Sequence, residues 1–353
     1  MRQALSPSFR RVGAVVFLTA VSLSAQTITG SIVGTVTDPS GAAVSNAEIT
    51  LIQTNTAAQR KTRTLTDGNF TISALEPGTY DLAVAAPGFK TVEKTGLLLT
   101  ATERLSAGTV VLPLGQTNES VTVKADAAVV QTASGEKSGV LNTYQLDNQP
   151  IKGRNVITFL QLLPGVVDTN NADAPDRNFA INLSINGNRR NAIGTSIDGV
   201  QTQDSGTGWI STANVSIDAI AEVKVLLNNY QAEYGRSRGA GVLMIGKSGT
   251  RDFHGSFNYF KRHEQFNAND FFNNRNSIPR QRYRYNMYSY TIGGPAYIPG
   301  LFNRNRNKLF FFWSQEIWPQ KVGQTLNATM PTELERAGNF SQTVDASGRP
   351  ITV

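Results

Sequence analysis

Few residues in this chain are suited to covalent or metal chemistry. The 353 residues include no cysteine and only two histidines, His254 and His263, whose spacing matches no zinc motif. The segment Gly241–Ser248 (GVLMIGKS) has the G-x-x-x-x-G-K-[ST] spacing of a phosphate-binding loop. A motif this short is weak evidence without the strand, loop and helix that must surround it, and we do not expect nucleotide binding. No spacing pairs a nucleophile with a base. The sequence therefore predicts that the protein is not an enzyme and carries no cofactor and no metal.

Three charged residues form a candidate cluster of another kind. Glu222, Glu233 and Arg236 lie near one another in the chain. Carboxylates beside a guanidinium form ion pairs more readily than they transfer protons. We interpret these three residues as a structural ion-pair cluster rather than as acid–base catalysts.

The N-terminus predicts export. Arg2, Arg10 and Arg11 precede the apolar run Val12–Leu23, and small residues follow it, which is typical of a secretory signal peptide. The apolar run is too short to cross about 30 Å of hydrocarbon as a helix. We therefore expect residues 1–25 to be a signal peptide and the mature chain to be exported.

The last third of the chain, residues 251–353, is rich in aromatic side chains. It holds 19 of the 30 aromatic residues, in strand-like runs such as Phe253–Phe260 and Leu309–Trp313. Alternating strands with rings at two interfaces are typical of an outer-membrane β-barrel, although a soluble sandwich with a one-sided core is an alternative. The region also has 13 Lys and Arg against 7 Asp and Glu. Because an exported chain rarely meets nucleic acid, barrel loops explain this charge better and no nucleic-acid partner is expected.

Residues 27–115 alternate apolar and polar side chains in seven short segments. Turn sequences such as Asp38–Gly41 and Asp67-Gly68 separate them. The expected strands are Ile28–Thr37, Ala47–Gln53, Arg60–Leu65, Phe70–Ala74, Thr79–Ala85, Lys90–Thr95 and Arg104–Leu112. Seven such strands indicate an immunoglobulin-like β-sandwich.

The segments Gly34–Ile49 (GTVTDPSGAAVSNAEI), Thr66–Phe70 (TDGNF), Leu75–Tyr80 (LEPGTY) and Ala86–Lys90 (APGFK) closely resemble the carboxypeptidase regulatory-like domain. The resemblance implies a rigid, non-catalytic module for spacing or binding. Its carboxylates, including Asp38 and Asp67, are then turn formers rather than calcium ligands.

Residues 116–125 form a polar linker with a short β-prone core. An exposed strand of this kind can pair with an edge of another protein. In TonB-dependent receptors, which the following residues resemble, a short strand before the plug pairs with the TonB-type energy-coupling protein. Glu119, Ser120, Val121, Thr122 and Val123 occupy the corresponding place, and a linker strand docked on a neighbouring domain is the alternative.

Residues 126–250 mix short strands, one helical stretch and Asn-Gly turns, as a compact α/β domain does. We expect a helix over Asn155–Leu163, hairpin turns at Ile185–Asn188 and Ser196–Val200, and either a helix and a strand or two strands over Ile217–Leu227. The segments Leu146–Asn155 (LDNQPIKGRN), Leu160–Gly165 (LQLLPG), Ile197–Gly199 (IDG), Ile220–Val225 (IAEVKV), Tyr230–Arg236 (YQAEYGR) and Gly239–Gly249 (GAGVLMIGKSG) are similar to the plug domain of TonB-dependent receptors. With the sandwich module, the resemblance points to the Oar-like subgroup. Glu222, Glu233 and Arg236 then hold the plug against the barrel wall.

The length of the barrel region implies that only the first barrel strands are present. Receptors of this type have about 22 strands. At roughly 20 residues per strand and loop, residues 251–353 provide about four or five, with Phe253–Lys261, Tyr283–Gly293 and Lys308–Trp318 the clearest. We expect an incomplete, truncated β-barrel that is poorly packed or extended unless further strands are supplied.

The sequence as a whole predicts the N-terminal part of a TonB-dependent receptor. Its implied role is to bind an external ligand, which is a siderophore, oligosaccharide or peptide, and to gate its import through a plugged barrel. Its implied partners are the coupling protein and outer-membrane lipid, and its implied location is the cell outer membrane with a periplasmic N-terminal domain. The alternative is a secreted or surface-attached adhesion protein whose β-sandwich binds carbohydrate or protein.

Overall fold

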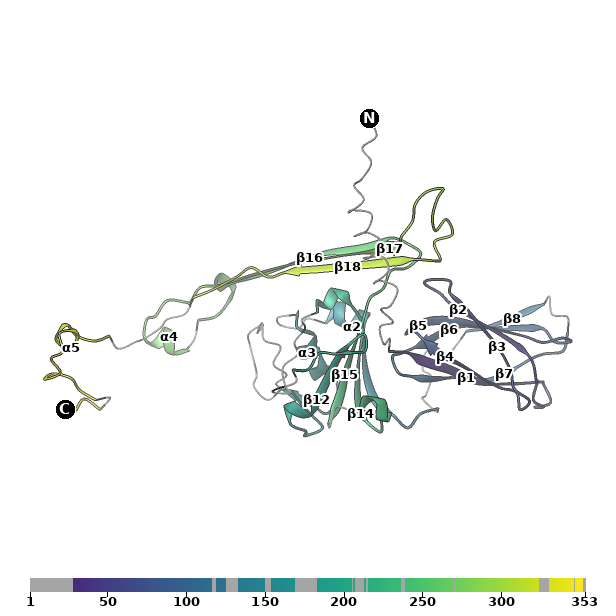
Figure 1. Cartoon of the computed structure of the whole chain (residues 1–353), viewed down its shortest axis with the longest axis horizontal. Coiled ribbons are helices and arrows are strands. Elements are labelled where there is room, and N and C mark those ends of the chain that lie inside the picture. The colour runs from purple at the N-terminus through teal and green to yellow at the C-terminus, as the bar shows by residue number, and fades with distance from the viewer. Residues whose placement is uncertain are drawn as a thin grey trace, which may run out of the picture. The chain divides into compact units, whose positions relative to one another are not determined.

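A computed structural model gives the fold of the chain (Figure 1). It describes residues 28–115, 119–124, 133–149, 154–168, 183–204, 206, 213, 215–235, 239–269, 271–323, 330–345 and 347–351. The expected signal peptide, residues 1–25, lies outside the described residues. By its internal contacts the chain divides into two compact units, residues 1–257 with 289–316 and residues 258–288 with 317–353.

The first folded part is a sandwich of two β-sheets, as the alternation predicted. All seven predicted strands are present: β1 Gly30–Thr37, β2 Glu48–Gln53, β3 Gln59–Arg63, β4 Asn69–Leu75, β5 Gly78–Ala85, β6 Thr91–Leu99 and β7 Arg104–Val111. One sheet has the order β4-β1-β7, and the other has the order β3-β2-β5-β6-β8, where β8 is Ser120–Lys124. The linker strand is therefore part of the sandwich.

Apolar side chains from alternate strand positions form the core of the sandwich. The largest fully buried ones are Ile32, Ile49, Leu51, Leu82, Leu97, Leu99 and Leu112. Because each such side chain gains about 1.5–3 kcal/mol on leaving water, this cluster provides most of the favourable free energy of the module.

Carboxylates shape the turns of the sandwich, as the sequence predicted. Asp67 Oδ1 accepts a hydrogen bond from the backbone N–H of Asn69 at 2.9 Å, in the turn where Gly68 has φ 75°. A Cβ at Gly68 would lie 2.6 Å from the carbonyl oxygen of Val36, so only glycine fits there. Asp38 makes equivalent bonds in the first turn, and hydrogen bonding lowers the pKa of both carboxyls below the usual value.

The plug region is an α/β domain built on one five-stranded sheet. Its strands are β9 Lys137–Asn142, β12 Ile193–Ile197, β13 Val200–Gln201, β14 Ile220–Asn228 and β15 Ala240–Gly246, in the order β13-β12-β15-β14-β9. A separate pair is formed by β10 Val166–Asp168 and β11 Leu183–Ile185. The helical elements are α2 Thr143–Asn148, α3 Val156–Phe159, η2 Leu160–Leu162, η3 Arg190–Ala192, η4 Ile217–Ala219 and η5 Ala232–Tyr234.

Local sequence signals predicted most of these plug elements. The expected helix over Asn155–Leu163 is present as α3 and η2, with the Asn155 side chain capping its first turn. Ile217–Leu227 begins as a helical turn and continues as a strand, which settles the alternative that periodicity left open. Asp198 and Gly199 have positive φ in the predicted β12–β13 hairpin.

The turn at Ile185–Asn188 was predicted as a hairpin, and this prediction is wrong. Asn186 and Gly187 do adopt positive φ, but the turn leads from β11 into η3, whereas β11 pairs with β10. A residue pair suited to positive φ determines that the chain reverses there, but not which strand the next segment joins.

The barrel region starts with an open sheet. Its strands are β16 His254–His263, β17 Tyr283–Pro295, β18 Phe310–Ile317 and β19 Gln320–Val322, in the order β16-β17-β18 with β19 also paired to β17. Short helical turns, η6 Glu264–Phe266, α4 Phe271–Arg275 and α5 Glu333–Arg336, lie in the connections and beyond them. The three clearest predicted strands are thus confirmed, and the sheet is open as expected.

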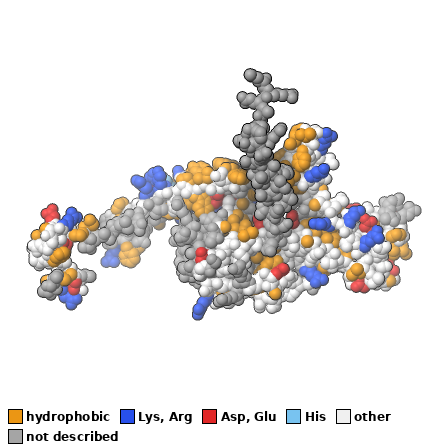
Figure 2. Space-filling view, viewed as in Figure 1, with side chains coloured by type: hydrophobic (Ala, Val, Ile, Leu, Met, Phe, Trp, Pro, Cys, Tyr) orange, Lys and Arg blue, Asp and Glu red, His pale blue; other side chains and the backbone are white. Residues whose placement is uncertain are grey.

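On β17 and β18, exposed side chains alternate with buried or half-buried ones. On β18, Phe311 and Trp313 are 39% and 59% exposed, whereas the residues between them are half-buried. On β17, Tyr290 and Ile292 are exposed, whereas Ser289 and its neighbours on the same face are buried. Figure 2 shows hydrophobic side chains along these strands. On β17 and β18, one face therefore carries uncovered apolar side chains, as outer-membrane strands do. The other face is buried or half-buried and mixes polar residues such as Ser289 with large ones such as Met287 and Phe312.

Among the described residues, no helix is long and apolar enough to cross a membrane.

Candidate functional site

The segment predicted to contact a coupling protein, Glu119–Val123, lies along the edge of the sandwich. From Ser120 onward it forms β8, which runs parallel to β6 with Ser120 opposite Thr91. Glu119 is held at two points: its carbonyl oxygen accepts the Thr91 N–H at 2.9 Å, and its carboxylate pairs with Lys90 Nζ at 2.5 Å. The segment therefore has the geometry of a strand docked on a neighbouring domain.

The register of β8 determines which of its peptide groups point outward. In a parallel ladder, residues of one strand direct both their N–H and C=O groups alternately toward and away from the partner strand. Because Thr91 bonds to Glu119, residues Glu119, Val121 and Val123 direct their peptide groups toward β6. Ser120, Thr122 and Lys124 direct theirs away, and β8 is the last strand in its sheet. The outer side of β8 can therefore accept another extended strand.

The structure separates the three plug residues that were predicted to pair with the barrel. The Glu222 carboxylate accepts the backbone N–H of Ala101, in the sandwich, at 3.0 Å. Glu233 lines a pocket between plug and sandwich residues. Arg236 lies outside the described residues. Their role against a barrel wall stays a prediction.

A polar contact that the sequence did not indicate links the plug to the barrel strands. Ser216, which caps η4, donates from its hydroxyl to Glu316 Oε2 on β18 at 2.8 Å and lies 3.4 Å from the Ser289 hydroxyl on β17. Glu316 shares its face of β18 with half-buried residues, whereas the exposed rings occupy the other face. The sequence offered one signal for this contact: Glu316 is a carboxylate at a position of β18 whose alternation places it on the half-buried face.

An ion pair lies immediately behind that contact. The Arg154 guanidinium is 2.7 Å from Asp218 Oδ1, and the side chain of Asp218 is 5% exposed. Ser216 also accepts the backbone N–H of Asp218 at 3.3 Å. Two contacts therefore hold the turn η4: the buried Arg154–Asp218 ion pair and the hydrogen bond from Ser216 to Glu316 on β18.

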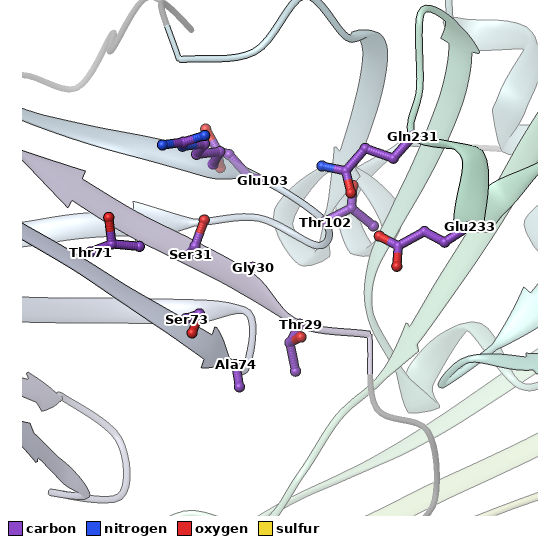
Figure 3. Close-up of a pocket in the computed structure, with 11 residues that line it drawn as sticks. Thr29, Gly30, Ser31, Thr71, Ser73, Ala74, Thr102, Glu103, Gln231 and Glu233 are labelled. Atoms are coloured by element: carbon purple, nitrogen blue, oxygen red, sulfur yellow. The ribbon is translucent and has the colours of Figure 1, made fainter.

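A pocket of about 360 Å³ lies where β1, the β6–β7 turn and η5 meet (Figure 3). Its lining includes the polar residues Thr29, Ser31, Ser73, Thr102 and Glu233. The Thr102 hydroxyl is buried and has no hydrogen-bond partner in the structure. Among the described residues, no group of three or more His, Asp or Glu side chains could hold a metal ion.

Three family models match successive parts of the chain. The Carboxypeptidase regulatory-like domain matches residues 31–113, the TonB-dependent Receptor Plug Domain matches residues 131–242, and the Outer membrane beta barrel domain matches residues 245–353. The chain therefore carries, in order, a regulatory-like sandwich, the plug domain of TonB-dependent receptors and the start of an outer-membrane β-barrel domain.

The chain is similar to the TonB-dependent transporter Oar of Myxococcus xanthus. The two are 26% identical over 234 residues, which cover 64% of this chain and 21% of the relative. The chain thus spans about a fifth of the length of the curated relative that it matches.

Solved structures of siderophore receptors are also similar to parts of the chain. The PirA receptor of Acinetobacter baumannii is 17% identical, with a TM-score of 0.36 over 51% of this chain and 24% of that one. The PirA receptor of Pseudomonas aeruginosa is 17% identical, with a TM-score of 0.31 over 45% of this chain and 26% of that one.

Proposed function

We propose that the protein acts in TonB-dependent import across the outer membrane, by ligand binding and gating rather than by catalysis. The observation that carries this proposal is the two-faced sheet at the start of the barrel region. Its outer face exposes rings such as Trp313, and its inner face contacts the plug through Glu316 and Ser216. An adhesion protein that keeps its aromatic third as a soluble core would bury those rings. The exposed rings therefore favour the receptor.

Further parts of the proposal follow from the family and from the sequence. The N-terminal signal peptide would direct export, so that the sandwich lies in the periplasm and the barrel strands lie in lipid. We also propose the domain limits expected from the sequence: 27–115 for the sandwich, 126–250 for the plug and 251–353 for the start of the barrel. The ligand class, siderophore, oligosaccharide or peptide, would be selected by plug loops and by extracellular loops.

The lipid contact is tested by placing a charge on the outer face. Trp313→Arg is expected to lower partitioning of the exported chain into lipid vesicles more than about tenfold, because a cation facing hydrocarbon costs about 2–4 kcal/mol near the bilayer centre. Flotation with the vesicles measures the bound fraction. Trp313→Phe should bind as the parent chain does, and Ser314→Arg, on the opposite face, should change partitioning much less. Equal losses for both arginine variants would argue against a lipid-facing Trp313.

The second component is the coupling partner. We infer that a TonB-type protein adds a strand to the outer side of β8, where Thr122 directs its peptide groups away from β6. Thr122→Pro removes an outward N–H and should weaken binding of a purified coupling-protein domain about tenfold or more, measured by calorimetry. Thr122→Ala keeps the backbone donor and should bind normally. Unchanged affinity for Thr122→Pro would show that β8 is not the contact strand.

A further inference from the structure

At the junction of the sandwich and the plug, two charged side chains of β14 bind the backbone of Ala101 on both sides. The N–H of Ala101 donates to Glu222 Oε1 at 3.0 Å, and its carbonyl oxygen accepts from Lys224 Nζ at 2.6 Å. Residues two apart on a strand point to the same face, so Glu222, Lys224 and Leu226 of β14 present one surface to the β6–β7 turn. Ala101, Leu226, Ile28 and Leu243 form a small buried apolar cluster there.

Lys224 depends on a counter-ion from a third segment. Its side chain is 1% exposed, and Glu136 Oε1 lies 2.8 Å from its ammonium, with the Glu136 side chain 2% exposed. A buried ammonium without a counter-ion is strongly destabilised. Lys224 therefore keeps its place against the Ala101 carbonyl because Glu136 compensates its charge.

Glu136 occupies a particular place in the chain. It directly precedes β9, the first strand of the plug sheet, and in the sequence it lies between β8 and β9. β9 pairs with β14, with Val140 opposite Lys224. In chain order, a pull that starts at β8 therefore arrives at Glu136 before β9.

We propose that the Glu136–Lys224 ion pair and the hydrogen bond from Lys224 to the Ala101 carbonyl hold the sandwich on β14, and that displacement of Glu136 releases it. When Glu136 is drawn away, the Lys224 ammonium loses its counter-ion and no longer holds the Ala101 carbonyl. The sandwich turn then separates from β14 and the plug sheet loses cover on that face. The origin of the pull rests on the proposed function, but the docking itself does not.

The two glutamates at this junction have different roles. Burial raises the pKa of Glu222 above the usual value, so its negative charge is disfavoured where it lies. Glutamine at position 222 would still accept the Ala101 N–H. At position 136, by contrast, glutamine removes the charge that compensates Lys224. Glu222→Gln is therefore the matched control for Glu136→Gln.

The absence of cysteine from the sequence permits a direct test on the full chain. Single cysteines at three alanines that are 0% exposed report on three places: Ala101→Cys on the junction, Ala107→Cys on the sandwich core and Ala240→Cys on the plug sheet. The rate of maleimide alkylation measures how often each site opens to solvent.

Glu136→Gln is expected to raise the alkylation rate at Ala101→Cys about tenfold or more and to leave the two core reporters within about twofold, because only the junction opens. Glu222→Gln keeps an acceptor for the Ala101 N–H but removes a carboxylate that also attracts Lys224, so it should raise the rate at Ala101→Cys less than Glu136→Gln does. An unchanged rate at Ala101→Cys would overturn the proposal. A parallel rise at all three cysteines would also overturn it, because Glu136 would then serve general stability. Neither result depends on the coupling protein, so a failure of β8 to bind that partner would be separately visible.

Discussion

Lys224→Ala is expected to destabilise the plug by about 3–5 kcal/mol, the cost of leaving one member of a buried ion pair unpartnered. In the variant, the Glu136 carboxylate stays buried without its cation, and the Ala101 carbonyl loses its donor. Hydrogen exchange of peptides from β14 measures the effect as a loss of protection. The matched control is Lys137→Ala, whose side chain is exposed beside Glu136 and should cost no more than about 0.5 kcal/mol.

A double variant separates loss of the charge pair from loss of packing. Combining Lys224→Met with Glu136→Met removes both buried charges while roughly keeping volume, and such replacements are often neutral. The double variant should therefore recover most of the stability that Lys224→Ala loses, although the Ala101 carbonyl still lacks its donor. If the double variant is as unstable as the single one, packing rather than charge explains the cost.

Phe159→Ala is expected to destabilise the plug by about 3–5 kcal/mol, because it removes a fully buried ring and leaves a cavity. Phe159 is 1% exposed at the end of α3, beside Leu160 at 0%. Denaturant unfolding followed by exchange of the α3 peptide measures the loss. Leu162→Ala in the next turn is the matched control, because Leu162 is 47% exposed and its truncation should cost less than about 0.5 kcal/mol. Similar losses for the two variants would contradict the observed orientation of this helix.

Lys224→Ala and Phe159→Ala also test whether the plug has regions of different stability, which gating requires. Gating requires that part of the plug opens at a lower free energy than the whole domain. Phe159 lies in the helix, whereas Lys224 lies at the junction with the sandwich. If Lys224→Ala increases exchange mainly in β14 and β9, and Phe159→Ala mainly in α3, the plug contains at least two regions of separate stability.

The strands of the sandwich and the first barrel strands were predictable because their signals are local. Alternation of apolar and polar side chains depends only on the two-residue period of a strand, and turns such as Asp67-Gly68 carry their own hydrogen bonds and φ preference. The helix at α3 was predictable for the same reason, from its apolar spacing and the Pro164-Gly165 stop.

The candidate site was less predictable because its contacts are distant in sequence. Glu222 was identified as a charged residue of the plug, but the backbone N–H that it accepts belongs to Ala101. The contact between Glu316 and Ser216 was not predicted, because a single carboxylate in a strand does not indicate which residue it will bind. The turn at Asn186-Gly187 showed the same limit, because local φ preference did not determine which strand β11 pairs with.

The sequence alone determined the order of modules, the strand segments and the two-faced character of the barrel start, because each follows from periodicity and turn chemistry within short windows. Only the tertiary structure decided that β8 docks on β6, that Lys224 is shared by Glu136 and Ala101, and that Ser216 contacts Glu316. These contacts depend on which surfaces meet after folding, when burial strengthens a charge or hydrogen bond that would contribute little in water.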